Sequence, residues 1–287
     1  MAPRIAPLIA ALGGEVSGLA PRDVLSDATK LAGSVRDLAR SLGVDVATVE
    51  FASRWDLGAA LDWSTYPPAV RPGQTGGDAS AGRGAATLTG APGPGGGAAT
   101  PGGDLAGVLL DAVARVRAEL DARVTVAASV TGPMLAARLT AADRATDAVA
   151  AAAKRALGAV RALAEAGAGL IWLVEDAQAP PDDPRAYARA LAPVLGTARF
   201  YRADVALHIA GAADGWLDAV RGLRGAIACF DPAASPALAA EPRPFGVTVA
   251  PGARALAADA ALVTHDGELA GRVPARDLRA AVDALRP

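Results

Sequence analysis

The chain has 287 residues, 28 of them basic and 30 acidic, with a formal net charge of −2 and 52% hydrophobic residues. This balance excludes the basic excess that nucleic-acid-binding proteins use to reach phosphates. The single cysteine, Cys229, excludes an intramolecular disulfide framework and a cysteine metal knuckle, and we expect it to be buried inside a strand. No apolar run is long enough to predict a membrane span, and we expect a cytoplasmic protein without a signal peptide.

Eight short segments have the composition of β-strands. Several of them are continuously apolar rather than alternating, which is typical of strands that are covered on both faces. In chain order the expected strands are residues 4–9, 44–51, 124–130, 170–175, 204–209, 226–230, 247–250 and 260–264.

Segments with helical spacing of apolar residues lie between these strands. The segment 184–200 opens with Pro184 after two aspartates, which predicts a capped helix start. After the sixth and seventh strands only residues 236–240 and 253–258 remain for a helix, so the helical cover is expected to be thin there. The expected helices are residues 22–41, 104–121, 142–166, 184–200, 214–223 and 274–285.

Residues 71–104 interrupt the pattern with glycine and proline throughout and almost no large apolar residue. Such a segment buries too little surface to offset the entropy of ordering it. We expect a flexible insertion loop. Two interpretations of this loop are possible: a mobile lid over a site, and a loop without function.

The alternation of strands and helices predicts an α/β fold, a single (β/α)₈ TIM barrel that spans residues 1–287. A doubly wound open sheet is the competing architecture. The strand count favours the barrel, and no glycine fingerprint of a dinucleotide-binding fold follows a strand.

Active sites of barrels lie at the carboxyl ends of the strands. Both histidines of the chain, His208 and His265, fall at such predicted ends. A neutral imidazole with a carboxylate can hold a divalent metal such as zinc, or it can act in acid–base catalysis near neutral pH. A polar cluster at the barrel rim without any ligand is the third interpretation.

Other polar residues follow the same strand ends. Arginines 54, 138, 243 and 272 are candidates to clamp a substrate carboxylate, and Trp55, Trp63 and Tyr66 are candidates for an aromatic wall. The candidate catalytic residues are His208, His265, Glu175 and Asp176, and the candidate substrate-binding residues are Glu50, Arg54, Asp56 and Thr131.

Short motifs in a characteristic order run through the chain outside the glycine-rich loop. They are Gly-Pro at 132–133, Glu-Ala-Gly-Ala at 165–168, Leu-His-Ile-Ala-Gly at 207–211 and Val-Pro-Ala-Arg-Asp-Leu at 273–278. In this order the chain resembles the uroporphyrinogen decarboxylase superfamily. That group includes zinc-dependent methyltransferases that act on corrinoid proteins, and it is similar to cobalamin-independent methionine synthase.

The resemblance implies a (β/α)₈ barrel, a small-molecule substrate and a homodimer. It also implies a set of zinc ligands. His208 matches the histidine of the His-x-Cys zinc motif of the methyltransferase branch, whereas Ala210 stands at the cysteine position. Asp231 lies near an acidic ligand of the methionine synthase relatives, and His265 stands where a further cysteine is expected. The implied zinc ligands are therefore His208, Asp231 and His265.

Three functions follow. The first is an enzyme on a small organic substrate, leaning to methyl or group transfer around His208, with or without a metal. The second is a decarboxylase of an anionic, tetrapyrrole-like substrate bound by Asp56 and arginines. The third is a non-catalytic barrel that serves as a binding or partner module. The arginine-rich motif that decarboxylases of this group carry after the first strand has no counterpart in residues 10–16.

Overall fold

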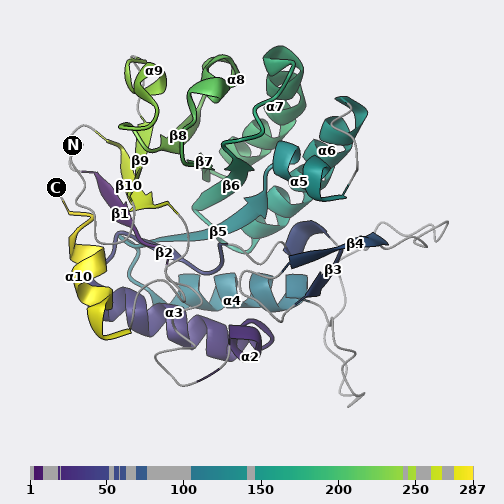
Figure 1. Ribbon diagram of the computed structural model, residues 1–287. Coiled ribbons are helices and arrows are strands. Elements are labelled where there is room, and N and C mark those ends of the chain that lie inside the picture. The colour runs from purple at the N-terminus through teal and green to yellow at the C-terminus, as the bar shows by residue number, and fades with distance from the viewer. Residues whose placement is uncertain are drawn as a thin grey trace.

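Eight parallel strands form one sheet in the computed structural model (Figure 1). The structure describes residues 3–8, 19, 21–51, 55–57, 59–62, 69–75, 105–140, 146–241, 245–249, 260–266 and 275–286. The strand order is β1-β10-β9-β8-β7-β6-β5-β2, which confirms the predicted barrel. The strands are β1 (Arg4–Ala6), β2 (Val46–Thr48), β5 (Thr125–Thr131), β6 (Leu170–Asp176), β7 (Asp204–Ala210), β8 (Ala226–Phe230), β9 (Phe245–Val249) and β10 (Leu262–His265). Each overlaps one of the eight expected segments.

Asp45 joins the two ends of this sheet, strands β1 and β2. Its backbone N–H donates to the carbonyl of Ile5 over 3.1 Å, and its carboxylate accepts from the N–H of Ile5 over 2.8 Å. The carboxylate thus takes the place of a backbone acceptor at the seam. The sheet is nearly closed, and the doubly wound open sheet is excluded.

Helices surround the barrel, with α3 and α4 side by side on one side and α6 to α9 spread over the other (Figure 1). None of the described helices is long and apolar enough to cross a membrane. The helices are α2 (Pro21–Leu25), α3 (Ala28–Leu42), α4 (Leu105–Glu119), α5 (Pro133–Thr140), α6 (Thr146–Glu165), α7 (Pro184–Phe200), α8 (Leu217–Gly222), α9 (Pro236–Ala239) and α10 (Leu278–Asp283), with 3₁₀ turns η1 (Trp55–Leu57), η2 (Asp214–Trp216) and η3 (Ala275–Asp277).

The helix boundaries follow local capping chemistry. Helix α7 has the predicted bounds, and Asp183 caps it by accepting from the N–H of Ala186 over 2.9 Å. The segment expected as one helix over 22–41 is divided into α2 and α3, because Asp27 caps the start of α3 by accepting from Thr29 and Lys30. Helix α5 was not expected from the sequence.

A two-stranded antiparallel sheet of β3 (Ala59–Asp62) and β4 (Ala69–Thr75) corrects the start of the expected insertion loop. Residues 71–75 belong to β4, because backbone pairing in a hairpin needs no large apolar side chain. The remainder of that expected loop, residues 76–104, lies outside the described residues.

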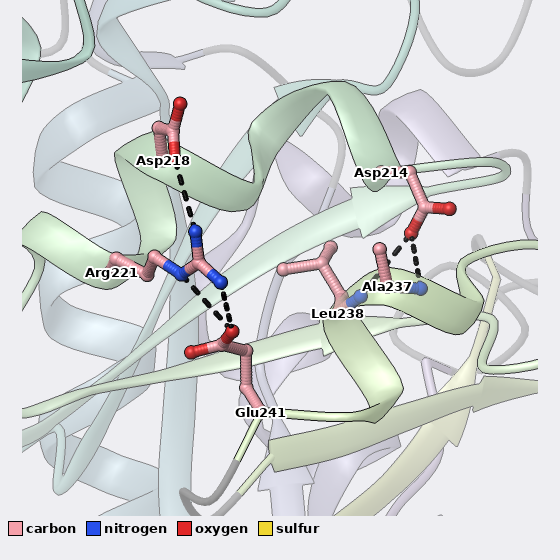
Figure 2. A network of polar contacts seen from close by, with 6 residues as sticks. All are labelled: Asp214, Asp218, Arg221, Ala237, Leu238 and Glu241. Carbon is pink, nitrogen blue, oxygen red and sulfur yellow. Dashed lines mark hydrogen bonds and ion pairs between the residues drawn. The ribbon is translucent and has the colours of Figure 1, made fainter.

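Polar contacts hold the short helices that follow β7 and β8 (Figure 2). Asp214 accepts from the backbone N–H groups of Ala237 and Leu238 over 3.1 and 3.2 Å, and so caps the four-residue helix α9. Arg221 on α8 bridges Asp218 and Glu241. The thin cover expected after the sixth strand is confirmed. The segment after the seventh, 250–259, lies outside the described residues.

Two apolar clusters lie on the two faces of the sheet. The larger one packs the strands against the helices, and the smaller one fills the barrel. Trp172 is the largest side chain of the interior and is fully buried. Cys229 is buried there as expected, and burial raises the pKa of its thiol. The interior cluster consists of Ala6, Leu8, Val46, Phe51, Ala127, Leu170, Trp172, Ala206, Cys229 and Leu262.

Candidate functional site

The barrel interior changes from apolar to polar toward the carboxyl ends of its strands. Successive residues of a strand point to opposite faces, so the inward positions can be followed from the apolar cluster upward. Beyond the apolar residues of β2, β5, β7, β9 and β10, the inward positions are polar and buried. These residues, which we call the mouth layer, are Thr48, Glu50, Ser129, Thr131, His208, Thr248 and Thr264.

Glu50 and Ser129 form one polar contact of this layer. The hydroxyl of Ser129 donates to the Glu50 carboxylate over 2.8 Å, and both side chains are buried. Thr48, two residues before Glu50, lies at the inner side of the mouth layer, where its hydroxyl accepts from the indole N–H of Trp172 over 3.3 Å. The buried carboxylate of Glu50 is therefore at the barrel mouth, where the sequence placed it.

The 3₁₀ turn η1 brings Asp56 over the end of β5. The indole N–H of Trp55 donates to the carbonyl of Ser129 over 2.9 Å. Asp56 accepts from both the backbone N–H and the hydroxyl of Thr131, over 3.1 and 2.8 Å. Burial raises the pKa of Asp56 to about 6, although the hydrogen bonds from Thr131 act in the opposite direction. A carboxyl group with this pKa exchanges its proton near neutral pH.

His208 on β7 points into the barrel. Its ring meets Phe51 and Trp172 edge to face, with centroids 4.8 and 6.1 Å away, and the side chain is 1% exposed. Nε2 lies 3.0 Å from the backbone carbonyl oxygen of His265. Because a carbonyl can only accept, Nε2 carries the ring proton and Nδ1 holds a lone pair.

The environment of His208 keeps this ring neutral. Burial lowers its pKa, and the hydrogen bond to the carbonyl of His265 offsets only part of that effect. Within the part of the chain that the structure describes, Nδ1 of His208 and Oγ1 of Thr248 are buried without a hydrogen-bond partner. Buried polar atoms in this state point to a missing partner such as a ligand or water.

His265 corrects the sequence prediction, because its side chain lies on the other face of the sheet. Leu262 belongs to the interior cluster and Val263 to a cluster outside the barrel, so alternation turns His265 outward. Its Nε2 is 3.4 Å from the carbonyl oxygen of Ala281 on α10. The side chain packs under a helix, and only its backbone carbonyl reaches His208.

The zinc set of His208, Asp231 and His265 is therefore not assembled. The two imidazoles lie on opposite faces of the sheet, and the carboxylate of Asp231 accepts from the N–H of Ala233 in its own turn over 2.9 Å. Among the described residues no three His, Cys, Asp or Glu side chains are placed to hold a metal ion. The donors present do not fit a zinc ion, which needs at least three converging protein ligands.

Glu175 also corrects the prediction, because it anchors helix α5 rather than facing the barrel mouth. Its carboxylate accepts from the N–H groups of Met134 and Leu135 over 3.1 and 2.8 Å, at the first turn of α5. The hydroxyl of Tyr187 on α7 donates to it over 2.9 Å. Burial raises the pKa of Glu175 to about 7, outweighing these hydrogen bonds. Gly132 lies so close that a Cβ there would be 2.2 Å from Cδ of Glu175.

This raised pKa predicts a pH-dependent stability. Between the ordinary value of 4.5 and about 7 the folded protein binds the proton of Glu175 more tightly than the unfolded chain, so stability falls as pH rises through this range. We expect the group to cost on the order of 3 kcal/mol at pH 8 relative to pH 4.5. Urea denaturation from pH 5 to 8 measures this slope.

Glu175→Gln is the comparison for that slope. Its amide nitrogen faces a backbone N–H donor, so its overall stability is lower, but it cannot titrate. The curves of wild type and variant should converge as pH rises. Parallel curves would show that Glu175 keeps an ordinary pKa. Asp56 has a raised pKa in both proteins and cancels in the comparison.

Asp176 sits at the carboxyl end of β6, where it forms an ion pair with Arg138 of α5. Its backbone carbonyl accepts from the indole of Trp216 over 3.2 Å. Arg138 is thus engaged by a carboxylate of the chain itself. The other residues proposed for substrate clamping and for an aromatic wall, Arg54, Trp63, Tyr66, Arg243 and Arg272, lie outside the described residues.

The sequence reasoning missed Thr248 in the mouth layer and Trp172 in the interior below it. The signal that finds them is alternation along a strand: Thr248 stands between the outward Val247 and Val249, and Trp172 lies two residues after the inward Leu170. In strands that are apolar on both faces this signal does not stand out, because inward and outward residues have the same character.

Comparison with known proteins identifies the fold. No protein-family profile and no curated protein sequence matches the chain. Among solved structures, a methyltransferase from Methanosarcina mazei matches with a TM-score of 0.67 at 17% identity, covering 99% of this chain and 92% of that one. A protein of Listeria monocytogenes assigned to the vitamin-B12-independent methionine synthases matches with a TM-score of 0.55 at 12% identity, over 100% and 96% of the two chains. At these identities the likeness shows a shared barrel fold.

Proposed function

We propose that this chain is an enzyme that transfers a methyl or another small group on an organic substrate held at the carboxyl end of the barrel. The observation that carries the proposal is His208, a buried, neutral imidazole whose Nδ1 has no hydrogen-bond partner among the described residues. The two solved structures with this fold, a methyltransferase and a protein assigned as a methionine synthase, support the choice of reaction class.

The mouth layer suits proton removal from an acceptor. The carbonyl of His265 fixes the tautomer of His208, so Nδ1 is the lone pair available to a substrate O–H, N–H or S–H group. As a lone pair of the acceptor atom forms the bond to the carbon of the transferred group, the bond from that carbon to the donor breaks and its electron pair stays on the donor. The acceptor's proton moves to the lone pair of Nδ1.

Two carboxylates would orient the substrate. One is Glu50 of the mouth layer, and the other is Asp56 on the 3₁₀ turn η1 over the end of β5. Glu50 is held by Ser129 and Asp56 by Thr131, so neither needs to reorganise when a polar group of the substrate arrives. The pKa of about 6 at Asp56 lets this group take up or give back a proton during turnover. Arg54, expected with them as a substrate-binding residue, lies outside the described residues.

The test is transfer of a labelled methyl group. The purified chain is incubated with a thiol acceptor and a methyl donor from each of three classes: a methylated corrinoid, a methylated pterin and a thioether. We expect one donor to be consumed, and we expect His208→Gln, which keeps a donor for the carbonyl of His265, to lower the rate about 10²–10⁴-fold.

His265→Gln is the matched control, because this histidine lies outside the barrel. We expect the folded fraction of this variant to retain its rate. Equal losses of the transfer rate in the two variants would mean that the substitutions act by disturbing packing and not by removing a catalytic group. If no donor is consumed, carbon dioxide release from a porphyrinogen tests the decarboxylase alternative. Inactivity in both assays would overturn the two enzymatic functions tested and favour the non-catalytic barrel.

A further inference from the structure

A cavity of about 160 Å³ opens at the opposite end of the barrel from His208. It lies where β7 and β8 begin, next to the end of helix α7. Arg199, Arg202, Asp204 and Gly225 line it. The proposed transfer reaction uses none of these residues.

The cavity has a net positive lining. Asp204, its acidic residue, is already engaged by Arg4 over 3.0 Å. In the part of the chain that the structure describes, Arg199 and Arg202 have no ion-pair partner. Ten basic residues of that part do form such pairs: Arg4, Lys30, Arg36, Arg115, Arg138, Arg161, Arg189, Arg221, Arg276 and Arg286. Two guanidinium groups therefore face the cavity without a partner carboxylate.

The backbone of Arg202 is unusual for its residue type. Its φ is +59°, and it is the non-glycine residue with positive φ among those described. The turn after α6 has the same hydrogen bonds, Gly167 to Ala164 and Ala168 to Leu163, as the turn after α7, Arg202 to Arg199 and Ala203 to Ala198. The first turn places glycine at the left-handed position, as is usual, and the second places arginine there.

A left-handed backbone is strained for a residue other than glycine. Such strain persists at binding sites, because the side chain is needed in that place. Gly225, whose φ is +90°, lies beside the other arginine. The position of a Cβ there would be 2.6 Å from Nη2 of Arg199, so this guanidinium rests close to the Gly225 backbone. A merely favourable charge at the end of α7 would not require the left-handed backbone of Arg202.

We propose that this cavity binds a phosphate group. Two forked guanidinium groups suit a tetrahedral oxyanion, which accepts paired hydrogen bonds from each of them. The site lies at the amino ends of the strands, so its ligand is bound without reacting there. The source of the phosphate is either the inorganic ion or a phosphorylated small molecule.

The test titrates inorganic phosphate into the purified chain by calorimetry, with sodium chloride adjusted to keep the ionic strength constant. We expect saturable binding of one phosphate per chain. Arg199→Gln and Arg202→Gly should each weaken it by at least about tenfold, since each removes a charged hydrogen-bond donor. Arg189→Gln, on the same helix but outside the cavity, should bind like wild type.

Arg202→Gly separates binding from folding. Glycine adopts the left-handed backbone without strain, so this variant should melt about 2–4 °C higher than wild type while binding phosphate more weakly. Sugar phosphates and nucleoside monophosphates, added as competitors of the bound phosphate, distinguish the two sources. If they occupy the cavity at a lower concentration than inorganic phosphate does, the ligand is a phosphorylated small molecule. If they compete only at a higher concentration, the ligand is the inorganic ion. Absence of saturable binding, or unchanged affinity in both cavity variants, would overturn the proposal.

Discussion

Gly132→Ala should destabilise the protein by about 3 kcal/mol or more. The new methyl group would lie 2.2 Å from Cδ and 2.4 Å from Oε1 of Glu175. Glu175 cannot move aside cheaply, because its carboxylate accepts from two backbone N–H groups of α5 and from Tyr187. Displacing it would leave the first turn of a buried helix without its acceptor. Urea denaturation measures the loss.

Two further variants test the cause. Gly158→Ala, in the middle of α6, meets nothing within 4 Å and should be stabilising by up to about 1 kcal/mol. In the background of Glu175→Ala, which removes the clashing atoms, Gly132→Ala should cost much less than it does in the wild type. Additive losses would mean that backbone conformation, not contact with Glu175, makes Gly132 necessary.

Trp172→Ala should lower the free energy of unfolding by about 3–5 kcal/mol. The indole is fully buried and fills the barrel interior, where Phe51 and His208 pack against it edge to face. The barrel strands are hydrogen-bonded to one another and cannot collapse into the space that is left. Its removal also takes away the hydrogen-bond donor to the hydroxyl of Thr48 and one of the rings that pack against His208.

The same variant connects stability with the proposed reaction. If His208 acts through a fixed Nδ1, the folded fraction of Trp172→Ala should lose transfer activity, and Trp172→Phe should retain part of it. Phe200→Ala is the control, because that ring is 79% exposed and its loss should change stability by less than about 0.5 kcal/mol. A loss near 1 kcal/mol for Trp172→Ala would mean that the interior is loosely packed.

The sequence predicted the elements of the fold more fully than their contacts. Each barrel strand overlaps an expected segment, because a strand that is covered on both faces must be an apolar run. Helix α7 was predicted to the residue from Asp183 and Pro184, since capping depends only on neighbouring residues. Helix α5 was missed because its amino end is fixed by Glu175, which lies about 40 residues away in the chain.

The candidate site was predicted in part. Position at a strand end correctly placed Glu50, Asp56, Thr131 and His208 near the barrel mouth, but it does not say which face of the sheet a side chain takes. His208 and His265 both end strands and point to opposite faces. The roles of the mouth residues in catalysis and binding stay predictions.

What the sequence by itself determined was the order of strands and helices, because the periodicity of apolar residues and the caps are local properties. Only the tertiary structure decided which polar groups meet. Glu50 finds Ser129 across 79 residues and His208 finds the carbonyl of His265 across 57. Such contacts depend on strand register and on the closure of the sheet through Asp45, and a shift of one residue would turn each inward side chain outward.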